Sequence, residues 1–118
     1  MTNYFLAIDI GASSGRHILG CVKNGIILLD EIYRFPNNLV RKGELLCWDY
    51  DALFGHILEG MKACKAAGKI PVSLGIDTWA VDYVLLDERG QPLGDTVAYR
   101  DSRTQGMDKL VEQRVPFQ

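Results

Sequence analysis

The first stretch whose residues could do chemistry is Ala-Ile-Asp-Ile-Gly-Ala-Ser-Ser-Gly-Arg, at residues 7–16. Its glycines let the backbone turn tightly and approach a ligand, while the hydroxyl groups of Ser13 and Ser14 add hydrogen-bond donors. The guanidinium group of Arg16 is a rigid fork that fits phosphate oxygens. These residues predict a phosphate-binding turn, beside which Asp9 would hold a hydrated magnesium ion. An ordinary hairpin turn is the alternative, because Gly-x-x-x-Gly is common in turns.

Acidic residues lie at or just after the ends of several predicted strands. Ligands usually bind at the carboxyl ends of the strands of an open α/β sheet. Clustered carboxylates there can bind Mg²⁺, or orient a hydroxyl group and accept its proton during phosphoryl transfer. Any one of these acids could instead cap a turn. Their shared placement favours a ligand site, and the residues are Asp9, Asp77, Asp82 and Asp101.

The elements around the Gly-rich turn are predicted to be strands. Residues 4–10 are almost all apolar, which is typical of a strand covered on both faces. Phosphate-binding turns usually lead into a helix, whose N-terminus helps to bind the anion. Here a strand pattern resumes at 16–22, and the Asn24-Gly25 pair then predicts a hairpin into a strand at 26–35. Three antiparallel strands are therefore expected.

A change of periodicity follows the strands. Apolar residues recur at helical spacing from about residue 51 to 67, which predicts an amphipathic helix that packs on the sheet. Further strands are predicted at 45–48, 72–77, 82–87 and 96–99, and a second helix is expected to begin at Ser102 and to run toward Arg114. Three strands, a helix and further strands predict an α/β fold with a mixed sheet.

Composition limits the class of protein. The chain has 118 residues, of which 47% are hydrophobic and 24% charged, so one domain with a real core is expected. A net charge of −2 without a basic cluster argues against nucleic acid or an anionic membrane as the partner. No signal peptide or membrane-length apolar run is visible, which predicts a cytoplasmic location. The three cysteines have neither disulfide nor zinc spacing.

Three blocks of sequence together resemble the N-terminal part of rhamnulokinases, in the FGGY carbohydrate kinase family. They are Ala-Ile-Asp-Ile-Gly-Ala-Ser-Ser-Gly-Arg (7–16), Gly-Ile-Asp-Thr-Trp-Ala-Val-Asp-Tyr-Val-Leu-Leu-Asp (75–87) and Val-Ala-Tyr-Arg-Asp-Ser-Arg-Thr (97–104). The first block is typical of the wider family, and the other two indicate the rhamnulose branch. The resemblance implies an actin-like, ribonuclease H-like domain, in which the first turn binds phosphate on a hairpin between antiparallel strands.

The resemblance also assigns site residues. It implies that ATP phosphates bind to Ala12, Ser13, Ser14, Gly15 and Arg16, and that Asp9 organises Mg²⁺. It implies a sugar pocket lined by Trp79, Ala80 and Asp82, with Arg100 and Asp101 nearby. Ala80 stands where rhamnulokinases carry glycine, which often marks close approach of a ligand, so the resemblance leaves the exact sugar contact there open. Trp79 could equally be a core or rim aromatic.

The same resemblance places residues 1–118 in the N-terminal part of the first of two actin-like domains, with the C-terminal domain absent. The parent protein is expected to transfer the γ-phosphoryl group of ATP to the 1-hydroxyl of L-rhamnulose, in rhamnose catabolism. The catalytic Asp of the family is expected beyond residue 118, so the chain alone is expected to be inactive.

Other functions stay open on the sequence. The sugar could be another ketose, L-fuculose or xylulose. The chain could also be a non-catalytic module that binds nucleotide or associates with itself through an unmatched apolar surface. A ribonuclease H-fold nuclease would use Asp9, Asp77 and Asp82 as two-metal ligands. The lack of a basic strip argues against the nuclease, because nucleic-acid binding needs phosphate neutralisation.

Overall fold

The computed structural model describes residues 1–116. The chain forms two compact units, the first made of Met1–Asn38 with Asp49–Val81, and the second of Leu39–Trp48 with the residues from Asp82 onward. The predicted domain range of 1–118 ends in residues 117 and 118, which lie outside the described part.

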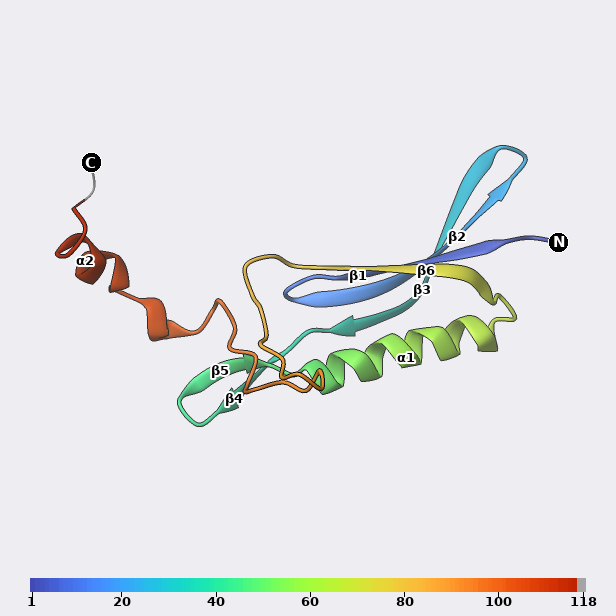
Figure 1. Cartoon of the computed structure of the whole chain (residues 1–118). Helices are drawn as coiled ribbons and strands as arrows, with labels where there is room; N and C mark the ends of the chain where they lie inside the picture. Colours follow the sequence, from blue (N-terminus) through green and yellow to red (C-terminus); the bar gives the residue numbers. More distant parts are fainter. Residues whose placement is uncertain (117–118) are drawn as a thin grey trace. The chain divides into compact units, whose positions relative to one another are not determined.

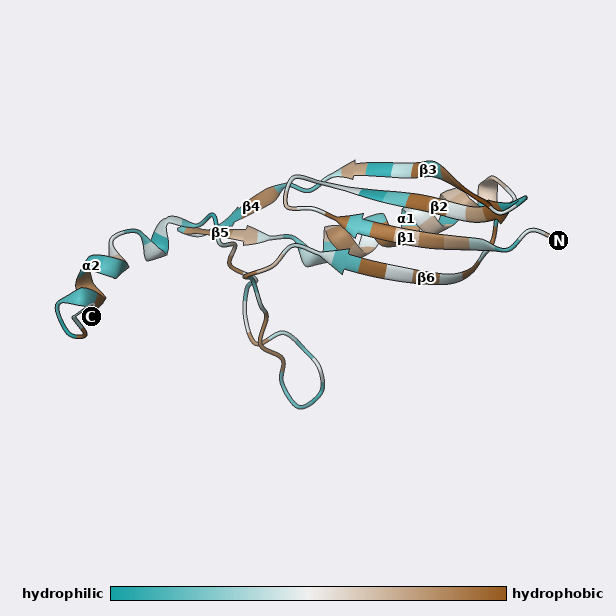
Figure 2. Cartoon of the chain, turned by 90° about the horizontal axis from the view of Figure 1, so that it is seen from above, coloured by the Kyte–Doolittle hydropathy of each residue, from teal (hydrophilic) through white to brown (hydrophobic). Residues whose placement is uncertain are grey.

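The first unit is built on a four-stranded sheet. Its strands are β1 (Tyr4–Ile10), β2 (Ser14–Lys23), β3 (Ile26–Pro36) and β6 (Pro71–Thr78), in the spatial order β3-β2-β1-β6. β1 and β2 pair antiparallel, as do β2 and β3, whereas β6 runs parallel to β1. Figures 1 and 2 show these strands side by side. The predicted mixed sheet, with three antiparallel strands followed by a helix, is confirmed.

The turn between β2 and β3 has the geometry that its sequence predicts. Asn24 has φ = 52° and Gly25 has φ = 76°. Positive φ at both central residues is the mark of a type I′ turn, whose twist matches that of the flanking strands. The Asn-Gly pair therefore sets the register of this hairpin.

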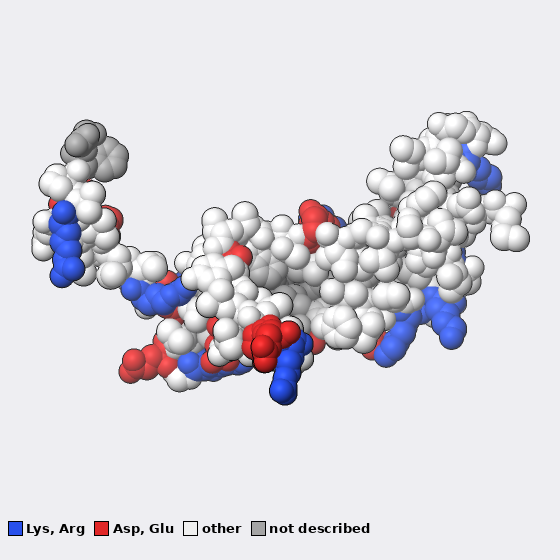
Figure 3. Space-filling view, viewed as in Figure 1, with Lys and Arg blue, Asp and Glu red and all other residues white. Residues whose placement is uncertain are grey.

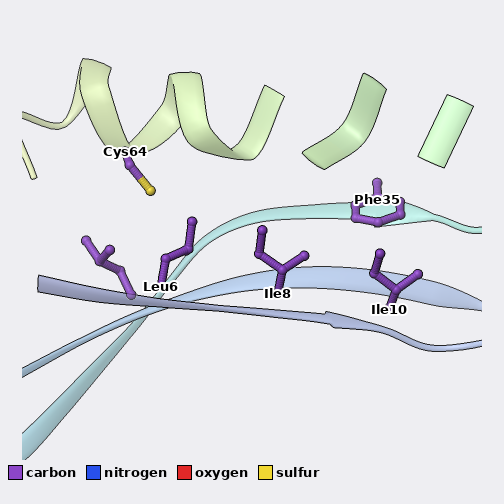
Figure 4. Packing of buried hydrophobic residues seen from close by; sticks show 6 residues of the cluster. Leu6, Ile8, Ile10, Phe35 and Cys64 are labelled. Carbon is purple, nitrogen blue, oxygen red and sulfur yellow. The ribbon is translucent and has the colours of Figure 1, made fainter. Parts of the chain in front are cut away.

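Helix α1 (Tyr50–Ala66) connects to β6 and covers one face of the sheet (Figures 1 and 2). The Asp49 side chain caps it by accepting a hydrogen bond from the Ala52 amide at 3.0 Å. Alternate residues of β1 point toward the helix, and Cys64 points from the helix toward them (Figure 4). The buried core cluster of this unit consists of Leu6, Ile8, Ile10, Leu19, Phe35 and Cys64.

The apolar residues of α1 divide between two sides. Leu53 and Ile57 pack against the core, whereas Phe54 and Leu58 are 61% and 41% exposed. An apolar groove runs between α1 and β6. A second lies on the sheet face opposite the helix, where Phe5 and Leu29 are 47% and 71% exposed. Both faces of this sheet therefore present uncovered apolar surface. On the face drawn in Figure 3, few charged side chains lie at the tip of the β2–β3 hairpin.

Close approach of α1 to β2 depends on Gly60. A Cβ atom at this position would lie 2.2 Å from the His17 ring, whose Nε2–H donates to the Ile57 carbonyl at 3.2 Å. Gly60→Ala is therefore expected to destabilise this chain by about 1–3 kcal/mol, because the helix must move away from the sheet. Gly55→Ala is the matched control. Its Cβ would meet nothing within 4 Å, so it is expected to stabilise the helix by about 0.5–1 kcal/mol. Urea unfolding measures both, and equal stability of the two variants would contradict this account.

The second unit has little regular structure. β4 (Leu39–Lys42) and β5 (Leu45–Trp48) pair antiparallel, and Val97 adds a single bridge to Cys47. A 3₁₀ turn, η1 (Ser102–Thr104), precedes α2 (Met107–Glu112). Within residues 1–116 no helix is long and apolar enough to cross a membrane.

Three local predictions in this unit were wrong. Residues 82–87 do not form a strand: Leu86 makes only an isolated bridge to Pro92, and Asp87 accepts bonds from the amides of a turn. Strand propensity needs a partner strand, and the loop pairs only with itself here. The expected strand at 96–99 is likewise reduced to one bridge. Ser102 does not cap a long helix, because Asp101 caps the short 3₁₀ turn instead.

Candidate functional site

The candidate site begins at the turn between β1 and β2, at residues 11–13. The Gly11 amide donates to the Ser14 carbonyl at 3.0 Å, and Ile10 and Gly15 form the next cross-strand pair. The chain then continues directly as β2, without a helix. The predicted turn therefore joins two antiparallel strands, and it places Ala12 and Ser13 at its tip.

Gly15 is required for packing. A Cβ atom on Gly15 would lie 2.1 Å from the Phe35 ring. Phe35 is 2% exposed and stacks on His56 with ring centroids 4.3 Å apart. The sequence suggested that Gly15 allows close approach to a ligand. The structure gives another reason for a glycine here, because the Phe35 ring of β3 lies against the backbone of β2 at this position.

Asn37 is a residue of this site that sequence reasoning missed. It is 7% exposed, and its side-chain amide donates to the Gly11 carbonyl at 2.9 Å. Its backbone amide donates to the Ser13 carbonyl at 3.0 Å. The only signal in the sequence was a polar side chain just after a strand, which is also what an ordinary loop contains.

A row of charged residues crosses the sheet beside the turn. Asp77, Asp9, Arg16 and Arg34 are successive cross-strand partners on β6, β1, β2 and β3. Paired residues of neighbouring strands point to the same face. Arg16 Nε lies 3.0 Å from Asp9 Oδ2, and Arg34 Nε donates to Glu31 at 2.8 Å. The row thus places two carboxylates next to two guanidinium groups.

The carboxylates of this row could hold a magnesium ion together with a phosphate ligand. Within the described residues, no group of three or more His, Cys, Asp or Glu side chains could hold a metal. Mg²⁺ usually keeps several waters and takes one or two carboxylates together with substrate phosphates. Asp9 and Asp77 are paired across β1 and β6 and could provide these carboxylates. Arg16 can bind phosphate oxygens.

Trp79 and Ala80 follow β6 in the same unit. Trp79 is partly buried and packs against the core cluster, whereas Ala80 is exposed. The next residue, Val81, has φ = 73°. A β-branched residue rarely adopts this left-handed conformation, so the backbone here is strained. Such strain is often stored at ligand sites.

The predicted sugar residues Asp82, Arg100 and Asp101 belong to the second unit. Asp82 accepts a hydrogen bond from the Trp48 indole at 2.6 Å. Arg100 Nε donates to the Tyr99 hydroxyl at 3.0 Å, and its guanidinium carbon lies 5.4 Å from the Tyr99 ring centroid. The hydrogen bond between Trp48 and Asp82 was not predicted from the sequence, because the two residues are distant in the chain.

Asp101 organises the backbone of this unit. Its carboxylate accepts from the Leu46 amide at 2.7 Å and from the Arg103 amide at 2.9 Å. These two backbone hydrogen bonds, first Leu46 and then Arg103, hold the pKa of Asp101 below its ordinary value. The structure therefore gives Asp101 a structural role, and its predicted contact with sugar stays a prediction.

The Asp101 contacts predict a pH-dependent stability. Because the pKa of Asp101 is lower in the folded state than in the unfolded state, its carboxylate stabilises the fold at pH values above the ordinary pKa. This stabilisation is lost as the pH falls through the lowered pKa of the folded state. Asp101→Asn is therefore expected to lower the Tm of this chain at pH 7, and the difference from the unmodified chain should shrink below about pH 4. Circular dichroism melts at pH 7 and pH 3 test this, with the exposed Glu88→Gln as control. A Tm difference equal at both pH values would contradict it.

Known proteins show clear similarity to this chain. No family model matches it. The chain is 58% identical over 113 residues to the rhamnulokinase of Halalkalibacterium halodurans, covering 94% of this chain and 24% of that protein. It is 54% identical over 102 residues to the rhamnulokinase of Oceanobacillus iheyensis, covering 86% of this chain and 22% of that protein. The chain thus spans about a quarter of the length of the curated relatives it matches.

Solved structures show the same fold. A gluconate kinase from Lactobacillus acidophilus matches with a TM-score of 0.73 at 14% identity, over 97% of this chain and 23% of that one. A ligand-bound xylulose kinase from the same organism matches with a TM-score of 0.71 at 15% identity, over 95% and 23%. In the quarter of the relatives' length that it spans, the chain is similar to rhamnulokinases, which confirms the resemblance carried by its three sequence blocks.

Proposed function

We propose that this chain is the phosphate-binding part of an ATP-dependent kinase that phosphorylates L-rhamnulose at its 1-hydroxyl. One observation carries the proposal. The β1–β2 turn lies directly beside the cross-strand pair of Asp9 and Arg16, whose side-chain atoms are 3.0 Å apart. A tight turn, a carboxylate and a guanidinium group are the parts that hold a nucleotide phosphate with its metal.

Each residue has a task in this proposal. Residues Ala12 to Arg16 receive the phosphates of ATP, and the Arg16 guanidinium orients and partly neutralises them. Asp9 holds Mg²⁺, with Asp77 as the neighbouring carboxylate. When bound, the metal would neutralise the charge that the phosphate oxygens carry during transfer. The Asp that accepts the proton of the sugar hydroxyl is proposed to lie beyond residue 118.

The uncovered apolar surface supports a place for this chain within a larger domain. Both the outer side of α1 and the sheet face opposite the helix expose large hydrophobic side chains, such as Leu58 and Leu29. Surfaces of this kind need a partner in a stable domain. In this proposal the chain is the N-terminal part of the first actin-like domain of a longer, cytoplasmic kinase. The rest of that protein would cover these faces.

The sugar is assigned by sequence similarity and by the block around Trp79. The relatives at 58% and 54% identity are named rhamnulokinase. In the proposal, Trp79 and Ala80 border the sugar, with the strained Val81 fixing the backbone that follows them. Asp82, Arg100 and Asp101, which belong to the second unit, are further sugar-binding residues in the proposal. L-fuculose and xylulose are the competing sugars.

The test is ADP release by the longer protein that carries this segment. With ATP and Mg²⁺, L-rhamnulose is expected to give the highest kcat/KM in a panel with L-fuculose, L-ribulose and xylulose. The 118-residue chain alone is the control, and we expect no turnover from it. Preference for another ketose would correct the sugar, whereas a longer protein without any sugar-dependent ADP release would refute the kinase proposal.

A further inference from the structure

We propose that Asn37 is a positioning residue that holds the β1–β2 turn in the conformation that receives phosphate. This inference rests on the proposed function and adds to it a residue outside the three sequence blocks. Asn37 lies directly after β3, far in sequence from the turn. It acts through the turn backbone and is not proposed to touch the nucleotide.

The contacts of Asn37 involve both ends of the turn. The side-chain amide donates to the Gly11 carbonyl at 2.9 Å, and the backbone amide donates to the Ser13 carbonyl at 3.0 Å. The residue is 7% exposed, so these bonds lie in an environment of low water access. A buried amide that lost such a partner would carry a desolvation penalty. The turn is thus fixed from the side of β3.

These bonds favour phosphate binding for an electrostatic reason. A phosphate is bound by N–H groups and repelled by carbonyl oxygens, whose dipoles point the opposite way. Asn37 engages two carbonyl oxygens of the turn, at Gly11 and Ser13. A third turn carbonyl, that of Ser14, accepts from the Gly11 amide. With these oxygens held in hydrogen bonds, the turn is preorganised before the anion arrives, and a preorganised site binds more tightly.

The position of Asn37 is fixed by the end of β3, which pairs with β2 and packs against it. Phe35 is buried under Gly15, and Ser14 and Gly15 pair in register with Pro36 and Phe35. Strand pairing, ring packing and the two amide bonds therefore all connect the same three-residue segment to the turn. Movement of Asn37 relative to the turn would have to break the end of the β2–β3 ladder.

The test separates positioning from simple stabilisation. In the longer protein, Asn37→Ala removes the side-chain donor and keeps the backbone bond. We expect KM for ATP to rise roughly 5- to 10-fold, because one buried hydrogen bond that orders the turn is lost. KM for the sugar is expected to change by less than about twofold, since the variant leaves the sugar residues untouched. Asn38→Ala, at the exposed neighbouring residue, is the matched control and should resemble the unmodified protein.

Direct binding measurements distinguish the outcomes. By calorimetry without sugar, Asn37→Ala should weaken ATP while leaving adenosine unchanged, because only ATP carries phosphates. Asn37→Leu, which fills similar volume without a donor, repeats the test if the alanine variant folds poorly. Equal loss for ATP and adenosine, or no loss for either, would overturn the positioning role. Failure of the unmodified protein to phosphorylate any sugar, with ATP binding still sensitive to Asn37, would refute the kinase proposal alone. Absence of ATP binding in the unmodified protein would refute both.

Discussion

Asp9→Asn in the longer protein is expected to lower kcat by about 100-fold or more, because removing a group that stabilises transferring charge typically costs that much. The variant keeps the size of the side chain and removes the charge that is proposed to hold Mg²⁺. A higher Mg²⁺ concentration should be needed for half-maximal activity, since neutral amide oxygen is a weaker ligand. Steady-state ADP release across a Mg²⁺ titration measures both effects.

Loss of fold does not explain the expected Asp9 result. The Asp9 and Arg16 side chains are 45% and 43% exposed, so their ion pair contributes at most about 1 kcal/mol to stability. Asp30→Asn is the matched control, because Asp30 also forms an exposed ion pair, with Lys69 at 2.8 Å. Asp30 pairs with Leu19 of β2, so it lies away from the end of β3 that adjoins the β1–β2 turn. Equal activity losses in the two variants would contradict the special role of Asp9.

Phe35→Ala is expected to cause the largest loss of stability in this chain, about 3–5 kcal/mol. The ring is 2% exposed, belongs to the core cluster and stacks on His56. Its removal leaves a cavity under the β1–β2 turn. Phe54→Ala is the matched control. It removes the same ring from α1, where Phe54 is 61% exposed. Urea unfolding should show a change for Phe54→Ala within about 0.5 kcal/mol, and a similar cost for both variants would contradict the packing described here.

A double mutant tests the contact between Phe35 and Gly15. Gly15→Ala alone should be strongly destabilising, because its Cβ would lie 2.1 Å from the ring. In the Phe35→Ala background the ring is absent, so the added methyl group should cost much less. We expect a coupling energy of about 0.5–3 kcal/mol between the two positions. Additive costs would contradict a direct contact between Gly15 and the Phe35 ring.

Local sequence signals predicted the first unit well. The apolar run that forms β1 and the Asn24-Gly25 turn act over a few residues, and neighbouring residues alone determine them. The cross-strand pair of Asp9 and Arg16 then follows from the short turn between them, since the register of a hairpin is set by its turn.

Long-range contacts could not be predicted in the same way. Asn37 meets Gly11 across 26 residues, and Trp48 meets Asp82 across 34. No periodicity connects such pairs. The prediction of a strand at 82–87 was wrong for a similar reason, because strand propensity does not say whether a partner strand is present. Asp101 resembled the other strand-end acids, but its carboxylate accepts hydrogen bonds from the distant backbone amide of Leu46 and the nearby backbone amide of Arg103.

We propose that ATP phosphates bind at the β1–β2 turn with a metal beside Asp9. The most direct test is a crystal structure of the longer protein with Mg²⁺ and a non-hydrolysable ATP analogue. We predict phosphate oxygens at hydrogen-bond distance, about 3 Å, from backbone or side-chain donors of residues 11–16, and the metal on the Asp9 side of the phosphates. Phosphates bound elsewhere, with this turn and Asp9 in contact only with solvent, would contradict the account.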